Sequence, residues 1–149
     1  MNRFALTVTV VATLLATSLF AARAAYAEKI TVYKTPTCGC CSGWVDYLRD
    51  NGFEVETHDL KSLVGIKAQH GLTDARLMSC HTAIVDGYVV EGHVPVNDIR
   101  RLISEKPDIL GITAPGMPQM SPGMRSDIPK NYDVLSFDRQ GRTDVFSRY

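Results

Sequence analysis

Three cysteines, Cys38, Cys40 and Cys41, lie within four residues of one another. Alternating polar and apolar residues at 29–33 predict a strand before them, and apolar residues at helical spacing after them predict a helix. The thiols therefore lie at a strand-to-helix turn, where unpaired backbone N–H groups and the positive end of the helix dipole favour thiolate. Thiolate is both a nucleophile and a metal ligand, so this motif predicts redox or soft-metal chemistry.

The first 27 residues have the features of a secretory signal. Arg3 precedes a long apolar stretch, residues 4–22, and Ala25-Tyr26-Ala27 places small residues at the two positions that a signal peptidase reads. An uncleaved membrane anchor is the alternative, because the stretch is nearly long enough to span a bilayer. The Ala- and Thr-rich composition and the cleavage pattern favour export, with cleavage after Ala27 and no membrane contact afterwards.

Residues 28–149 have the size of one domain. The leader contains two basic residues, Arg3 and Arg23, and no acid, so the remaining chain has two more acidic than basic residues. It has no basic run with interleaved aromatic residues, the pattern that binding to phosphate backbones requires. Nucleic acid is therefore not an expected partner.

All four cysteines, the three above and Cys80, lie in the exported part of the chain, where disulfides can form. Two structural disulfides are one interpretation. The spacing argues against it, because structural bridges gain most by closing long loops and only Cys80 is far from the others. A Cys38–Cys41 bridge would be a redox-type CxxC loop, which leaves Cys40 and Cys80 as the other pair.

Hydrophobic periodicity predicts the order β-α-β-α-β-β-α between residues 29 and 105. Its strongest local signal is an Asp86-Gly87 turn between two strands. This order resembles the thioredoxin and glutaredoxin arrangement, an α/β fold with a central mixed sheet flanked by helices and a thiol motif after the first strand. Where that fold carries a proline beside its thiols, this chain has Ser79-Cys80-His81. The resemblance thus implies that Cys80 lies next to the other three cysteines.

Beyond Ile109 the composition changes to a segment rich in Pro, Gly and Met, residues 111–124, in which Pro-Gly-Met occurs twice. Such a stretch is not expected to form a helix or a central strand, so we expect a loop over the body of the domain. The residues that follow, 132–137 and 143–149 around a Gln140-Gly141 turn, predict a C-terminal β-hairpin.

The crowding of the thiols favours copper over zinc. Cu(I) prefers thiolate and thioether ligands, whereas zinc takes four ligands in a tetrahedron, usually from spaced cysteine pairs. Adjacent Cys40 and Cys41 do not easily chelate one tetrahedral ion together with Cys38, but they can bridge several soft ions. The sequence therefore favours a multi-copper thiolate cluster.

Three methionines of the Pro-, Gly- and Met-rich segment, Met117, Met120 and Met124, add thioethers to the possible ligands. Packing in a core or a lid is the ordinary alternative, because methionine fills irregular gaps well. That alternative is favoured for Met120 and Met124, and Met117 is retained as a secondary metal ligand.

Histidine is a borderline ligand that neither identifies nor excludes copper. His81 follows Cys80 directly, so alternation along a strand would turn the two side chains to opposite faces and make joint ligation awkward. His93 follows the predicted hairpin, where the next helix begins near the thiols. His81 and His93 are secondary metal ligands, and His58 and His70 are expected on the surface.

Several spaced motifs follow the leader, namely Lys34–Cys41 with Trp44, Gly52-Phe53, Ser79–Ala83, Gly87-Tyr88, Glu91–Pro95, Pro115–Pro118 and Ser121–Met124. Together they closely resemble the CopG-type family, exported copper-resistance proteins long catalogued as a domain of unknown function. The match covers nearly the whole chain after the leader. One position departs, since Arg125 stands where an acidic residue would be expected. The resemblance implies a thioredoxin-like fold, a periplasmic location and copper bound through Cys38, Cys40, Cys41 and Cys80.

Two functions compete with the structural module of two disulfides considered above. In the first, the protein holds or hands on Cu(I) in the periplasm through its four cysteines, and its partners are copper ions and other periplasmic copper-handling or efflux proteins. In the second, it is a thiol-disulfide or copper oxidoreductase in which Cys38 attacks and Cys41 or Cys80 resolves the mixed disulfide. The additional Cys40 favours the metal, because an oxidoreductase needs only two thiols.

Overall fold

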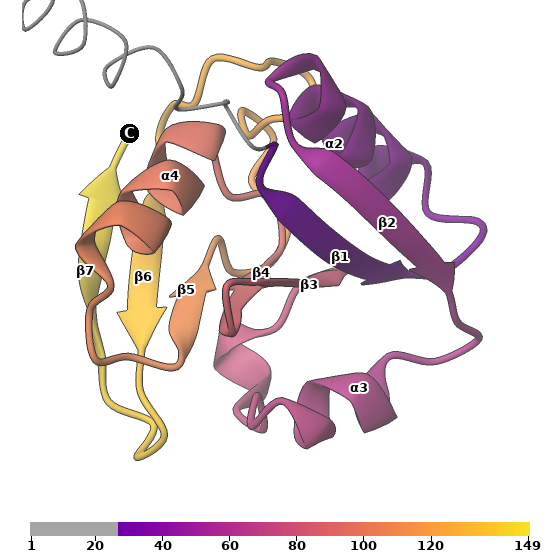
Figure 1. Cartoon of the computed structure of the whole chain (residues 1–149). Helices are drawn as coiled ribbons and strands as arrows, with labels where there is room; N and C mark the ends of the chain where they lie inside the picture. The colour runs from indigo at the N-terminus through magenta and orange to yellow at the C-terminus, as the bar shows by residue number, and fades with distance from the viewer. Residues whose placement is uncertain (1–26) are drawn as a thin grey trace, which may run out of the picture.

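The computed structural model describes residues 27–149, so the predicted leader lies outside the described residues except for Ala27. The described chain forms a seven-stranded mixed sheet in the order β2-β1-β3-β4-β5-β6-β7 (Figure 1). In chain order the elements are β1 (Lys29–Lys34), α2 (Gly39–Asp50), β2 (Glu54–Asp59), α3 (Val64–Gln69), the 3-10 helix η1 (Ala75–Leu77), β3 (Thr82–Val85), β4 (Tyr88–Glu91), α4 (Val96–Glu105), β5 (Gly111–Thr113), β6 (Asp133–Phe137) and β7 (Thr143–Arg148). None of these helices is long and apolar enough to cross a bilayer.

The first four strands confirm the predicted order of elements. β1 and β2 are parallel and are joined through α2, whereas β1 pairs antiparallel with β3, and β3 antiparallel with β4. The β3–β4 hairpin turns at Asp86 and Gly87, whose φ angles of 46° and 83° suit a tight hairpin turn. Because Tyr33 pairs with Thr82, the end of β1 lies beside the start of β3. This pairing agrees with the thioredoxin- and glutaredoxin-like sheet expected from the sequence.

One prediction was wrong, because the Pro-, Gly- and Met-rich segment is not entirely loop. Residues Gly111–Thr113 form β5, a buried strand parallel to β4 and antiparallel to β6. The first proline comes only at Pro115, so nothing in this short run interrupts the ladder. A Cβ added at Gly111 would collide with the Val89 carbonyl of β4. The predicted C-terminal hairpin is confirmed as β6 and β7, and β5 joins it to the rest of the sheet.

Apolar side chains cover both faces of the sheet. Val90 packs in the cluster formed with α2 and α4, whereas its neighbour Val89 packs in a second cluster on the opposite face. Trp44 of α2 is fully buried in the first cluster, and its indole N–H donates to the Val94 carbonyl at 2.9 Å. Burial of such a side chain stabilises the fold by about 1.5–3 kcal/mol. The contact fixes α2, and the thiols at its start, on the sheet.

A buried ion pair supports the segment that leads to the fourth cysteine. Lys67 of α3 is 6% exposed and Glu91 of β4 is fully buried. The Lys67 ammonium binds the Glu91 carboxylate and donates to the Thr82 hydroxyl at 2.9 Å, and that hydroxyl donates to Glu91 at 2.7 Å. Glu91 also accepts the backbone N–H of Ser79 at 2.6 Å. The carboxylate therefore anchors the chain one residue before Cys80.

The loop after β5, residues 114–132, lies directly against the start of α2. A Cβ added at Gly43 would lie 2.9 Å from the Gly123 carbonyl oxygen, and one added at Gly123 would collide with the Trp44 backbone nitrogen. Gly123 also has a φ of +78°, in the region that favours glycine. This pair of glycines lets the second Pro-Gly-Met motif approach the thiol end of the helix.

We expect Gly123→Ala to destabilise the fold more than Gly116→Ala. The two glycines have similar φ angles, +78° and +69°, and alanine in this region costs about 1–2 kcal/mol. Nothing lies within 4 Å of a Cβ placed at Gly116, whereas a Cβ at Gly123 meets the backbone of α2. Such overpacking costs about 1–3 kcal/mol in addition. Urea unfolding measures the difference, and equal losses would show that the loop can leave α2 freely.

Lys67→Met should lower the free energy of unfolding by about 3–5 kcal/mol, because it leaves the Glu91 carboxylate buried without its countercharge. Lys29→Met is the matched control: it removes an exposed ion pair with Glu56, whose N–O distance is 2.9 Å, and should cost little. Urea unfolding compares the two variants. Similar losses in both would mean that water reaches Glu91 when Lys67 is absent.

Candidate metal centre

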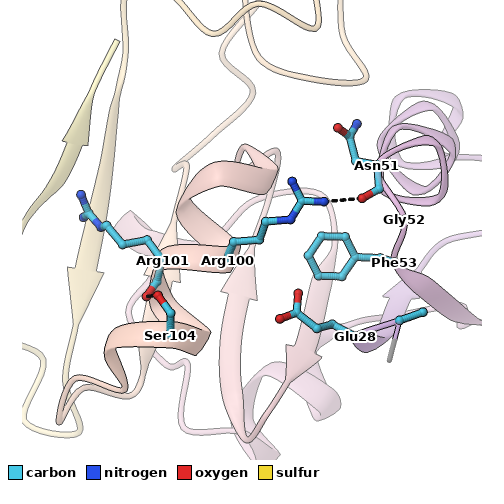
Figure 2. A pocket seen from close by; sticks show the side chains of 8 residues that line it. Glu28, Asn51, Gly52, Phe53, Arg100, Arg101 and Ser104 are labelled. Atoms are coloured by element: carbon cyan, nitrogen blue, oxygen red, sulfur yellow. Dashed lines mark hydrogen bonds between the residues drawn. The ribbon is translucent and has the colours of Figure 1, made fainter. Parts of the chain in front are cut away.

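A surface cleft of about 700 Å³ opens between the end of α2 and α4 (Figure 2). Arg100 and Arg101 of α4 and Phe53 contribute to its walls, and the Arg100 guanidinium donates to the Asn51 carbonyl. None of the residues that line the cleft carries a thiol, a thioether or an imidazole. The predicted metal ligands lie instead at the other end of α2.

Three cysteines lie where the sequence predicted, at the N-terminus of α2. Cys38 directly precedes the helix with extended φ and ψ angles of −80° and 93°, and Cys40 and Cys41 belong to its first turn. The backbone N–H of Cys38 donates to the Thr35 carbonyl at 3.1 Å, which closes the turn after β1. The Cys38 side chain makes no capping hydrogen bond to the first N–H groups of the helix. Its free N–H groups and positive dipole end therefore lie beside the sulfur atoms.

The fourth thiol comes from the segment between η1 and β3. The sulfur atoms of Cys38, Cys40, Cys41 and Cys80 all lie within 4.8 Å of one another. Cys41 is fully buried, and its sulfur is 3.7 Å from the Cys80 carbonyl oxygen. The structure thus brings together the four cysteines that the sequence singled out, and their role as metal ligands stays a prediction.

A disulfide joins Cys38 and Cys41, whose Cα atoms are 5.3 Å apart, while Cys40 and Cys80 are free. This is the redox-type CxxC bridge that the sequence allowed. Since residues 27–149 contain no second disulfide, the interpretation of two structural bridges is not supported. A metal ion that binds all four sulfurs requires the disulfide to be reduced first.

The Cys80 thiol is protonated at neutral pH. Burial, and to a lesser degree the neighbouring Cys40 sulfur, raises the pKa of Cys80 to about 11. A metal that takes Cys80 as thiolate must therefore displace its proton. The same shift makes Cys80 a poor nucleophile at neutral pH, so Cys41 is the better candidate for the resolving thiol.

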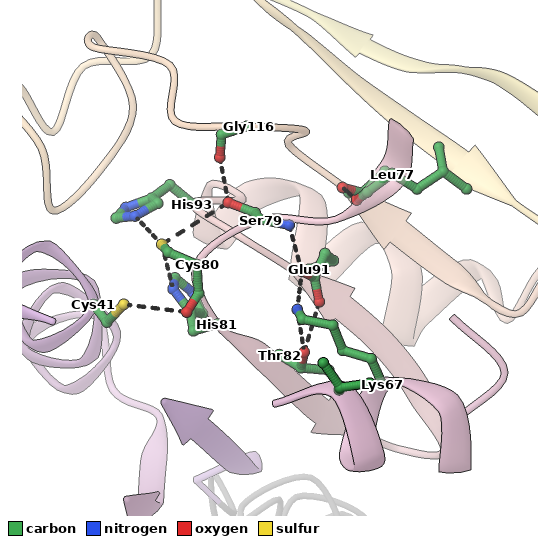
Figure 3. Close-up of polar contacts among 12 residues, drawn as sticks. Cys41, Lys67, Leu77, Ser79, Cys80, His81, Thr82, Glu91, His93 and Gly116 are labelled. Atoms are coloured by element: carbon green, nitrogen blue, oxygen red, sulfur yellow. Dashed lines mark hydrogen bonds and ion pairs between the residues drawn. The ribbon is translucent and has the colours of Figure 1, made fainter. Parts of the chain in front are cut away.

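Two histidines flank the Cys80 sulfur (Figure 3). His93 Nε2 lies 3.2 Å from it, and His81 Nδ1 lies 3.4 Å from it. Both side chains are fully buried, and burial lowers the pKa of each imidazole below its usual value. The expectation that strand alternation turns His81 away from Cys80 was wrong, because β3 begins only at Thr82 and the two residues precede the regular ladder.

The loop after β5 fixes the orientation of His93. Its Nδ1 lies 2.8 Å from the Pro122 carbonyl oxygen, so Nδ1–H donates to that oxygen and Nε2 presents a lone pair toward Cys80. The His81 ring packs on Trp44 with centroids 4.4 Å apart, and its Nε2 has no hydrogen-bond partner among the described residues. Sequence reasoning missed the Pro122 carbonyl, because a backbone atom has no residue-type signal.

The remaining candidates lie outside this group. Met117 is 54% exposed, and its role as a peripheral ligand stays a prediction. Met120 and Met124 are partly buried. His58 is exposed and His70 partly exposed, in agreement with the expectation that both are surface residues.

Comparison with known proteins finds relatives of this chain. A family model described as "Protein of unknown function, DUF411" matches residues 77–124, the part that contains Cys80, both buried histidines and most of the loop. No curated protein matches.

Two solved structures of "Copper resistance protein copG", Form 1 and Form 2, are each 38% identical to this chain, with a TM-score of 0.76. Each match covers 83% of this chain, together with 98% of the Form 1 chain and 99% of the Form 2 chain. Identity at this level over almost the full length of the solved chains shows that the protein belongs to the CopG-type copper-resistance family.

Proposed function

We propose that this protein is exported to the periplasm and there binds Cu(I) as a multi-copper cluster held by the thiolates of Cys38, Cys40, Cys41 and Cys80. The observation that carries the proposal is the approach of all four sulfurs to within 4.8 Å of one another, in a chain of a copper-resistance family. Copper is the cargo of the site. The protein stores it or passes it to other copper-handling or efflux proteins of the periplasm.

The arrangement of the sulfurs supports a soft ion of low coordination number. A zinc centre would need four ligands about 2.3 Å from one ion in a tetrahedron, yet Cys40 and Cys41 are consecutive residues in the first turn of a helix. Cu(I) prefers thiolate ligands, and thiolates that bridge several ions can each contact more than one of them. Met117, on the exposed loop, is the proposed thioether ligand at the rim.

Copper loading depends on the oxidation state of the thiols. Reduction of the Cys38–Cys41 disulfide takes two electrons and two protons and yields two thiols. Cu(I) then displaces the thiol protons, including the strongly held proton of Cys80. A periplasmic thiol reductant supplies the electrons in this scheme.

A second candidate function, thiol-disulfide exchange, is favoured by the Cys38–Cys41 disulfide itself. Cys38 is partly exposed while Cys41 is fully buried, as expected for an attacking and a resolving thiol. In the reduced protein the Cys38 thiolate attacks a substrate disulfide and forms a mixed disulfide. Cys41 then attacks the Cys38 sulfur, which releases the substrate as a dithiol and restores the disulfide of the protein.

Cys80→Ser should weaken Cu(I) binding by the reduced mature protein at least about tenfold, because the cluster loses the one ligand that a distant segment supplies. Anaerobic Cu(I) titration against a competing chelator measures the affinity, and elemental analysis counts the metal. Met120→Leu is the control and should change neither. Unchanged stoichiometry and affinity in Cys80→Ser would exclude the four-cysteine site, and fewer than two coppers per unsubstituted chain would exclude a multi-copper cluster.

Cys40→Ser should separate the two candidate functions, since Cys40 belongs to the copper cluster but takes no part in the Cys38–Cys41 exchange. We expect this variant to lose Cu(I) affinity. It should still reduce a substrate protein disulfide at the rate of the unsubstituted protein, in an assay where a small dithiol re-reduces the Cys38–Cys41 disulfide after each turnover. Cys38→Ser is the matched control and should abolish both. If the unsubstituted protein shows no turnover in this assay, the oxidoreductase function is wrong.

A further inference from the structure

The cleft between the end of α2 and α4 has the size of a small-molecule site. Its volume of about 700 Å³ lies within the usual range of roughly 300–1,000 Å³. Arg100, Arg101 and Glu28 are the charged residues that line it, so its wall carries one more positive than negative charge. The cysteines lie at the opposite end of α2, and the candidate metal centre therefore makes no use of this cleft.

The Arg100 guanidinium is held in place at one side of the cleft. It donates to the Asn51 carbonyl and lies 5.6 Å from the centroid of the Phe53 ring, which is a cation–π contact. Figure 2 shows the side chain reaching from α4 across Phe53 to Asn51. Arg100 forms no ion pair within residues 27–149. Since a guanidinium has five N–H donors, Arg100 offers unused donors and an uncompensated charge.

Arg101 is held by β7. Its guanidinium carbon lies 3.7 Å from the centroid of the Phe146 ring, and the guanidinium donates to the Phe146 carbonyl at 2.7 Å. The nearest carboxylate, that of Glu105, is exposed and 3.9 Å away, which is too long for a hydrogen bond. Consecutive residues of a helix point about 100° apart, and Figure 2 shows the two arginine side chains directed in opposite directions from α4. The cleft therefore presents two separate cationic groups.

Two separate guanidiniums favour a ligand with two anionic groups. A single small anion can pair with one of them, whereas a molecule with a carboxylate at each end can pair with both. Carboxylate also matches the planar fork of a guanidinium, since two parallel N–H···O bonds can form. Because ring and carbonyl contacts already orient Arg100 and Arg101, ligand binding costs less side-chain entropy than at free arginines.

The sequence beside the cleft adds no further negative charge. Residues 1–26 contain no Asp or Glu, so the predicted leader has no carboxylate side chain to neutralise the arginines. Cleavage after Ala27, as expected from the sequence, would add an α-ammonium group to Glu28, which lines the cleft. The Glu28 carboxylate is then the single charge of the lining that opposes an anion.

We propose that this cleft binds a small dicarboxylate, with Arg100 pairing with one carboxylate and Arg101 with the other. The proposal goes beyond Cu(I) binding, and the two sites share no residue. The cleft thus gives the protein a second ligand class, an organic anion, at the end of α2 remote from the thiols.

The test titrates the mature chain at low salt with malonate, glutarate and pimelate, which differ in the spacing of their carboxylates, and follows amide chemical shifts by NMR. We expect saturable binding, with shifts confined to Phe53, its neighbours and the α4 residues that line the cleft. The best dicarboxylate should bind at least about tenfold more tightly than the monocarboxylate of the same chain length. Inorganic phosphate, a single compact anion, should bind more weakly than the best dicarboxylate.

Substitutions separate the two arginines from the general charge of the protein. Arg100→Gln and Arg101→Gln should each weaken binding of the best dicarboxylate at least about tenfold. Arg100→Lys keeps the charge but loses the fork, and should weaken binding about threefold or more. Glu28→Gln should strengthen binding about twofold or more, because a like charge is removed. Lys61→Gln is the control, since this exposed residue does not line the cleft, and it should change nothing.

Equal affinity for dicarboxylates and monocarboxylates, or binding of phosphate as tight as that of the best dicarboxylate, would overturn the proposal. Equal losses in Lys61→Gln and the arginine variants would also overturn it, because the attraction would then follow the net charge. Circular dichroism checks the fold of Arg101→Gln, which loses its contacts with β7. If this variant unfolds, Arg100→Gln and the shifts in the unsubstituted protein decide. Cu(I) titration has a different readout, so the two proposals fail separately.

Discussion

The Glu91 carboxylate holds the part of the chain on which the candidate metal centre depends. It lies fully buried at the end of β4 and accepts the backbone N–H of Ser79 at 2.6 Å. Ser79, Cys80 and His81 precede β3 and so lack the continuous ladder of hydrogen bonds that fixes a strand. A charge-assisted bond to the backbone replaces that support. Lys67 and Thr82 also bind this carboxylate, so it links α3, β3 and β4 to the segment that brings the Cys80 sulfur to the cysteines of α2.

The loop after β5 completes the centre from the opposite side. Its Gly123 approaches Gly43 so closely that neither position has room for a side chain, and the preceding residue, Pro122, directs its carbonyl at His93. The sequence interpretation assigned the Pro-Gly-Met repeats to possible thioether ligands. In the structure the glycine and the proline carbonyl make the contacts with the site, while Met117 lies 54% exposed. The composition of this loop therefore reflects close backbone packing as well as any affinity for copper.

Local patterns in the sequence predicted the elements well, because alternation, helical spacing and the Asp86-Gly87 turn each act over a few residues. The convergence of Cys80 on the other cysteines followed from the fold that this order resembles. Four features escaped prediction, because none of them is encoded in a local pattern of residue types. β5 is a strand because β4 and β6 lie on either side of it. His81 faces Cys80 because the ladder begins one residue later. The Glu91 anchor and the Pro122 bond use backbone atoms, which any residue type possesses.

The Cys80 sulfur lies at the centre of the candidate metal site, with both sulfur and nitrogen donors around it. Its proton is strongly held, since burial raises the pKa of the thiol to about 11, so any metal must compete with that proton. Three other sulfurs lie within 4.8 Å of it, and the imidazole nitrogens of His93 and His81 lie 3.2 and 3.4 Å from it. Formation of the Cys38–Cys41 disulfide withdraws two of the three neighbouring sulfurs without touching the imidazoles. A change of two electrons at the start of α2 therefore changes how many free sulfur donors lie beside Cys80.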